Sequence, residues 1–166
     1  MAALLRPEVA AHCRGLLALQ APFLGSPVAD AICRAWLLPK VVDTALRMLR
    51  LGNGEGISDL TSAARASWMA RHAEAVAALL RQVPVVCAGA TLTAPAIGSE
   101  RNFLPVMRWM LKRGAGPNDG LVPLASSMLP GAPHVVFKGG HRALVAIGSG
   151  RDPIGALRQL LPMVLR

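Results

Sequence analysis

The chain has 166 residues and a mass of 17.4 kDa, and 53% of its residues are hydrophobic whereas 16% are charged. Its mean hydropathy of +0.44 excludes a disordered chain, and its length fits one globular domain or part of a larger one. The net charge of +9 does not indicate nucleic-acid binding, because the arginines are scattered singly and three Phe, three Trp and no Tyr form no stacking surface for bases.

The first half of the chain predicts a strand and then a long helical segment. Leu16–Gln20 is a short apolar run that enters a Pro- and Gly-containing loop, which is typical of a buried parallel strand. From about residue 27 to 81 the apolar spacing becomes helical, as it is at Val28, Ile32, Trp36, Val42, Leu46 and Leu49. Ser58 or Asp59 is expected to cap the last helix of this segment. Because one crossover needs fewer residues, we interpret residues 28–81 as an inserted helical lid or cap.

The second half alternates strands and helices. We predict strands at Val83–Ala88 and His134–Phe137, a short helix at Phe103–Leu111 and a closing helix at Arg151–Leu165. Asp152 and Pro153 begin the closing helix, where an acid and a proline suit the first turn. Strands separated by helical stretches predict the α/β class with a mainly parallel sheet.

Two polar turns follow the ends of the predicted strands, where ligands bind in open α/β sheets. Residues 116–123 contain a Pro-Asn-Asp-Gly turn that presents Asp119, and two glycines directly after the third strand present His141. An acid followed 22 residues later by a histidine matches the order of the last two members of a hydrolase triad, in which the acid orients the imidazole that deprotonates a serine. An ordinary loop Asp and a structural His remain the alternatives.

With these motifs in view, the chain resembles the C-terminal part of bacterial triacylglycerol lipases and related esterases of the α/β-hydrolase superfamily. The stretch from Leu17 to Asp30 resembles the strand and loop after their nucleophile helix, residues 118–122 resemble their acid loop, and Gly140-His141 resembles their histidine loop. The resemblance covers nearly the whole chain. It implies that Asp119 is the triad acid, that His141 is the triad base, and that the helical insertion covers an acyl pocket.

The chain departs from this family at the nucleophile, because no serine has Gly two positions before and two positions after it. In the family the serine precedes the acid and the histidine, so the resemblance implies that it lies upstream of Met1, together with the oxyanion hole. Cys87 is a weak substitute, since no helix is expected directly after it. Ser26 is followed by Pro27, and its hydroxyl is expected to bond to nearby backbone.

No metal, cofactor or membrane span is predicted. Cys13, Cys33 and Cys87 are widely spaced, which favours small buried side chains over a zinc site or a disulfide framework, although one disulfide is left open. Secreted bacterial lipases place an acidic calcium ligand just after the catalytic histidine, whereas here Arg142 follows, so no calcium site is expected. Residues 82–99 lack charge but contain prolines and glycines that argue against a membrane span, and the first residues do not resemble a signal peptide.

These observations predict a serine hydrolase of lipase or esterase type, which would act on a hydrophobic ester or lipid and of which this chain holds the acid and the histidine. The chain alone is then expected to be inactive. The alternative is a truncated, catalytically inactive remnant that acts as a binding or interaction module. In either case a partial sheet exposes an apolar edge, so self-association is expected.

Overall fold

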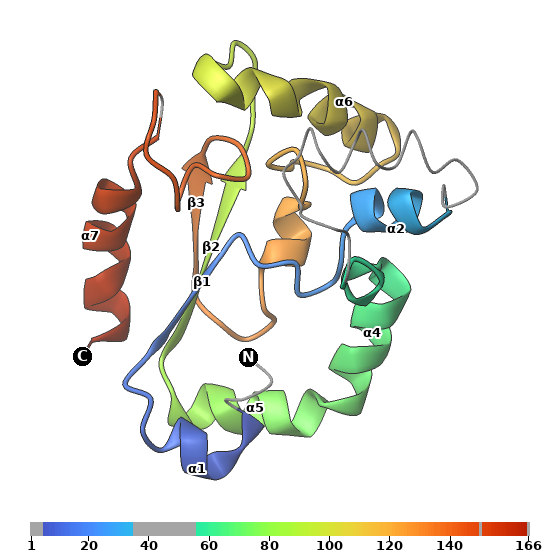
Figure 1. Cartoon of the computed structure of the whole chain (residues 1–166). Helices are drawn as coiled ribbons and strands as arrows, with labels where there is room; N and C mark the ends of the chain where they lie inside the picture. Colours follow the sequence, from blue (N-terminus) through green and yellow to red (C-terminus); the bar gives the residue numbers. More distant parts are fainter. Residues whose placement is uncertain (1–4, 35–55, 150, 166) are drawn as a thin grey trace.

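The computed structural model of the protein describes residues 5–34, 56–149 and 151–165. Three parallel strands form one sheet in the order of the sequence (Figure 1). They are β1 (Leu16–Leu19), β2 (Val85–Thr91) and β3 (His134–Lys138). All three begin where the sequence predicted a strand or within two residues of it, and the parallel α/β fold is confirmed. Since the strands run in one direction, their carboxyl ends meet at one edge of the sheet.

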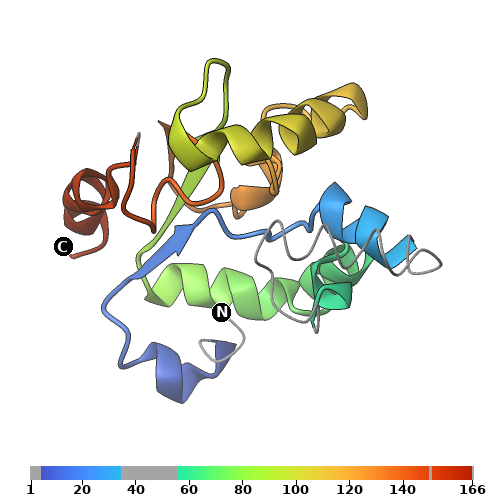
Figure 2. The ribbon, with the colours of Figure 1, turned by 45° about the horizontal axis from the view of Figure 1, so that its top comes forward.

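Helices cover both faces of this sheet (Figures 1 and 2). On one face, Ala156, Leu160 and Val164 of α7 (Pro153–Val164) pack with alternate residues of the central strand. On the other face, α5 (Ala73–Gln82) packs against the sheet with its buried residue Val76. The alternation of side chains along a strand explains why β2 is buried on both faces and reads as one apolar run.

The remaining helices of the described residues surround these layers. They are α1 (Pro7–Ala10), α2 (Pro27–Arg34), η3 (Ser58–Leu60), α4 (Ser62–Arg71), η4 (Gly98–Phe103), α6 (Leu104–Lys112) and η5 (Leu124–Ser127). A second apolar cluster lies between α6 and α2, where Met107 and Met110 of α6 pack with Val28 and with the loop residues Leu121 and Val122. Helix α6 therefore supports the loop that follows it, which contains Leu121 and Val122.

The strand β2 differs in its bounds from the prediction of Val83–Ala88. It begins later because Val83 still caps α5, and it continues through Gly89 to Thr91. Gly89 is a poor strand former by propensity. Here, however, a Cβ on this residue would lie 2.5 Å from side-chain atoms of both Leu124 and Ser127, so its lack of a side chain allows η5 to pack on the strand.

The helical segment also differs in detail from the prediction. The N-cap of α4 is Thr61, whose side chain accepts a hydrogen bond from the backbone nitrogen of Ala64, and neither Ser58 nor Asp59 caps the helix. Residues 35–55 of the predicted lid lie outside the described residues. Helix α5 packs on the sheet, so the predicted lid of residues 28–81 also contains a helix of the core.

Candidate functional site

Asp119 lies in a tight turn, as its Pro-Asn-Asp-Gly sequence predicts, but this turn follows α6 and does not directly follow a strand. It lies beside the carboxyl end of β2, because the Leu92 nitrogen donates to the Asn118 oxygen at 2.8 Å. The Asp119 carboxylate is 2% exposed, and its Oδ1 accepts hydrogen bonds from the backbone nitrogens of Leu121 at 2.9 Å and Val122 at 2.7 Å. Asn118 stabilises the same turn by accepting from the nitrogen of Gly120 at 3.0 Å. The turn itself therefore orients the carboxylate and leaves its Oδ2 for other partners.

The structure brings Asp119 and His141 together, although 22 residues separate them. His141 follows β3, and its Nδ1 lies 2.9 Å from Oδ2 of Asp119. A carboxylate can only accept, so Nδ1 carries the hydrogen of this bond. The imidazole thus has Nε2 left to exchange a proton with another group, and its side chain is 29% exposed whereas the carboxylate is buried.

Gln20 is a third member of this cluster that the sequence analysis did not identify. It follows β1 directly and is 3% exposed. Its Nε2 donates to Oδ2 of Asp119 at 2.8 Å and to the backbone oxygen of Gly140 at 3.0 Å. Its position at the end of the predicted strand Leu16–Gln20 was the one signal that could have pointed to it.

A buried ion pair holds the histidine loop from the other side. Glu100 is 3% exposed, its Oε2 accepts from the backbone nitrogen of Gly140, and its Oε1 lies 2.6 Å from Nε of Arg151. A Cβ on Gly140 would meet the Glu100 carboxylate, so glycine at this position permits the contact. Gly140, the residue before His141, is therefore bound at both its backbone nitrogen and its backbone oxygen.

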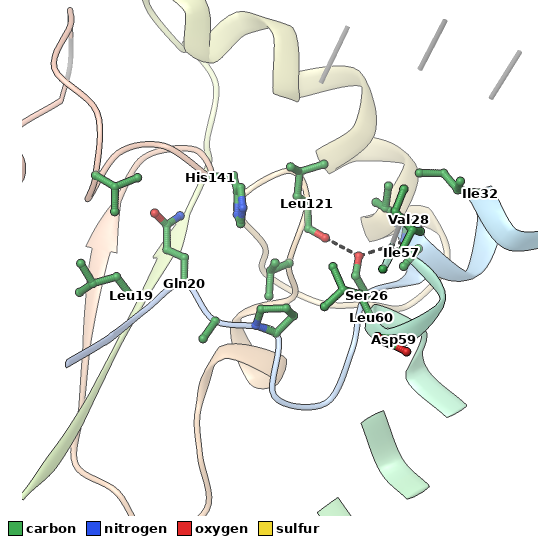
Figure 3. Close-up of a pocket in the computed structure, with 16 residues that line it drawn as sticks. Leu19, Gln20, Ser26, Val28, Ile32, Ile57, Asp59, Leu60, Leu121 and His141 are labelled. Carbon is green, nitrogen blue, oxygen red and sulfur yellow. Dashed lines mark hydrogen bonds between the residues drawn. The ribbon is translucent and has the colours of Figure 1, made fainter. Parts of the chain in front are cut away.

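A mainly apolar pocket of about 580 Å³ opens beside His141 (Figure 3). Its lining comes from the end of β1, from α2, from the η3 region and from the loops after α6 and β3. The lining residues include Leu19, Gln20, Pro22, Ser26, Val28, Ile32, Ile57, Leu60, Leu121, Val122, His141 and Val145. Because few polar groups face this space, it suits a hydrophobic ligand portion placed next to the imidazole.

The motif Gly25–Asp30 builds one wall of this pocket. Ser26 Oγ donates to the backbone oxygen of Leu121 at 2.5 Å and accepts from the nitrogen of Val28 at 3.1 Å, so its hydroxyl bonds to local backbone, as predicted, and also ties this wall to the acid loop (Figure 3). The Asp30 carboxylate accepts from the nitrogen and the hydroxyl of Ser62 at 2.8 and 2.7 Å. These residues are structural parts of the site.

Cys87 lies on the buried strand β2 and outside the pocket lining. It is 0% exposed, and burial raises the pKa of its thiol, an effect that a hydrogen bond from the Leu129 nitrogen partly offsets. A raised thiol pKa disfavours the thiolate, which is the nucleophilic form. All three cysteines are free, and the expectation that they are buried holds at Cys87 but fails at Cys33, which is exposed, and at Cys13, which is partly exposed.

The described residues offer neither a metal-binding cluster nor a membrane-spanning helix. No group of three or more His, Cys, Asp or Glu side chains in these ranges lies close enough to hold a metal ion. None of the helices in the described part of the chain has the length and hydropathy needed to span a membrane.

The fold and the position of the site define the open α/β class in which ligands lie at the carboxyl ends of parallel strands. Within this class the chain is similar to a particular solved structure, the mature form of the Bacillus licheniformis lipase BlEst2, with a TM-score of 0.71 and 16% sequence identity. The chain therefore shares its fold with that structure, which is consistent with the predicted resemblance to the C-terminal part of such enzymes.

The similarity covers 96% of this chain and 59% of the lipase, so the chain spans somewhat more than half the length of that enzyme. No protein-family model matches the chain, and no curated protein does. At 16% identity the likeness concerns the fold.

Proposed function

We propose that this chain provides the acid and the base of a carboxylic ester hydrolase of lipase or esterase type. The observation that carries the proposal is the hydrogen bond of 2.9 Å between Asp119 and His141, beside an apolar pocket. In the proposed mechanism, a serine supplied by a segment upstream of Met1 attacks the ester carbonyl. His141 Nε2 takes the serine proton and returns it to the leaving alcohol, and Asp119 holds the ring and stabilises the imidazolium.

The pocket supports a hydrophobic ester or lipid as the substrate class. The acyl portion would occupy the space between α2 and the acid loop, next to His141, where apolar side chains replace water. Within the predicted lid of residues 28–81, α2 and η3 line this pocket and would cover it, whereas α5 packs on the sheet. The lid and the substrate class both follow from the proposed hydrolase activity.

The proposal is tested by reading the DNA upstream of the Met1 codon in the same frame and expressing the extended chain. We expect a strand and a Gly-x-Ser-x-Gly motif there, and hydrolysis of a p-nitrophenyl ester by the product. Asp119→Asn should lower kcat by about 10⁴-fold, since the wrong imidazole tautomer results. Asp152→Asn is the matched control, because Asn caps a helix as well as Asp does. Equal turnover in the two variants would refute the triad.

A second candidate, a non-catalytic interaction module, is favoured by an apolar stripe on the outer face of α7. Its residues recur at intervals of three or four and are 39 to 60% exposed: Ile154, Leu157, Leu161 and Leu165. Within the described residues, β1 also has one edge without a partner strand. Such a surface suits association with a second copy. Leu157→Lys with Leu161→Lys should convert an oligomer to a monomer in sedimentation velocity. An unchanged molar mass would exclude this interface.

A further inference from the structure

We infer that Gln20 is a positioning residue that fixes the acid loop and the histidine loop relative to one another. The inference rests on the proposed function, since it assigns a role to a residue that supports the Asp119–His141 pair. It concerns the residue directly after β1, whereas Asp119 lies in the loop after α6 and His141 in the loop after β3. Gln20 therefore connects the end of β1 with both of these loops.

Both hydrogens of the Gln20 side-chain nitrogen are used in this connection. One is donated to Oδ2 of Asp119 at 2.8 Å, and the other to the backbone oxygen of Gly140 at 3.0 Å. The opposite orientation of the amide would place its oxygen against two acceptors, so the partners fix which atom is nitrogen. His141 is the residue after Gly140 and bonds to the same Oδ2. The Gln20 nitrogen thus binds both the Asp119 carboxylate and the backbone next to His141, the two residues that form the pair.

The conformation of Gln20 carries a free-energy cost. Its φ is +50°, in the left-handed region that favours Gly or Asn. Its Oε1 is buried without a hydrogen-bond partner among the described residues. A glycine at this position would adopt the same φ without strain and would bury no side-chain oxygen. Local strain and an unsatisfied polar atom that persist at a cleft are typical of functional sites.

The side chain of Gln20 also lies where such a role requires it. It lines the pocket together with His141, and Figure 3 shows its amide nitrogen on the side of the imidazole. Its backbone nitrogen donates to the oxygen of Ala88 at 2.7 Å, which keeps it in register with the central strand. Pairing with β2 therefore fixes the backbone from which the Gln20 amide extends.

The experiment uses the chain of 166 residues and two variants, Gln20→Asn and Gln20→Gly. Both Asn and Gly tolerate the left-handed backbone. The Asn side chain is one methylene too short to reach both acceptors, and Gly has no side chain. The readout is the Nδ1 proton of ¹⁵N-labelled His141 in NMR spectra, both its presence and its rate of exchange with water. We expect a protected signal in the parent chain and exchange faster by about tenfold or more in both variants, the effect of losing one hydrogen bond to a charged group.

Ser126→Ala is the matched control, because it removes a buried hydrogen bond of 2.6 Å to the oxygen of Gly25 without touching Asp119 or Gly140. It should lower the melting temperature and leave the His141 signal unchanged. The inference is overturned if both Gln20 variants keep the parent signal, if the control alters it equally, if the parent shows no Nδ1 proton, or if neither Gln20 variant folds. Ester turnover is no part of this readout, so failure of the extended chain to hydrolyse esters would refute the proposed function alone.

Discussion

The buried ion pair between Glu100 and Arg151 should contribute strongly to the stability of the histidine loop. The two side chains are 4% and 8% exposed, and they are joined at 2.6 Å. Arg151→Met would leave the Glu100 carboxylate buried without its cation. Breaking such a pair by removing one partner costs about 3–5 kcal/mol. For a domain of this size, that loss lowers the melting temperature by about 6–20 °C.

A double variant separates the cost of an unpaired charge from the cost of lost packing. Glu100→Gln keeps an acceptor for the Gly140 nitrogen, so Glu100→Gln with Arg151→Met removes both charges and retains that hydrogen bond. We expect the double variant to lose about 1–3 kcal/mol, less than Arg151→Met alone, because no buried charge remains.

Urea denaturation followed by circular dichroism gives the free energies of unfolding of the parent, the two single variants and the double variant. The measurement is repeated at high salt, which should change little for a pair that water does not reach. The reasoning is refuted if Arg151→Met loses less than about 1 kcal/mol, the range of an exposed pair. It is also refuted if the losses of the single variants simply add in the double variant.

Two further predictions concern Cys87 and Gly120. Burial raises the folded-state pKa of Cys87 above its ordinary value of 9.0. Its contribution to stability is thus complete below pH 9 and is lost as the pH rises through the folded-state pKa, by at most about 1.4 kcal/mol per pH unit. Urea denaturation from pH 8 to 10 should show this loss, and Cys87→Ala should remove it; an equal loss in that variant would contradict the assignment. Gly120→Ala should destabilise more than Gly114→Ala in thermal melts: both residues have positive φ, but a Cβ would lie 2.6 Å from Phe103 Cβ at Gly120 and meet nothing within 4 Å at Gly114. Equal melting temperatures would show that φ alone matters.

The sequence predicted the fold well, because its strands and turns are coded locally. A run of apolar residues between loop signals is enough to locate β1 and β3, and the Asp-Gly turn at Asp119 shows where a polar side chain is presented. His141 was found because two glycines precede it. The contact between these two residues was a prediction from their order, and the structure brings them within 2.9 Å.

Gln20 and Glu100 were not predicted, because their importance lies in partners far along the chain. Gln20 bonds to residues 99 and 120 positions away, and Glu100 bonds to Gly140 from a distance of 40 positions. Nothing in the local sequence of Glu100 distinguishes it from an exposed residue of a polar loop. Thr61 was missed for a different reason, since Ser58, Asp59 and Thr61 are all good caps and tertiary packing selects among them.

The order of the strands has a consequence for how the site forms during folding. Every strand pair is parallel and joins segments far apart in the sequence, so no hairpin can nucleate the sheet locally. The cluster of Gln20, Asp119 and His141 joins residues after β1, after α6 and after β3, so it needs the sheet to bring these segments together. We therefore expect a probe of the His141 ring during refolding to report completion of the sheet, and a partly folded chain to lack the contact between Asp119 and His141.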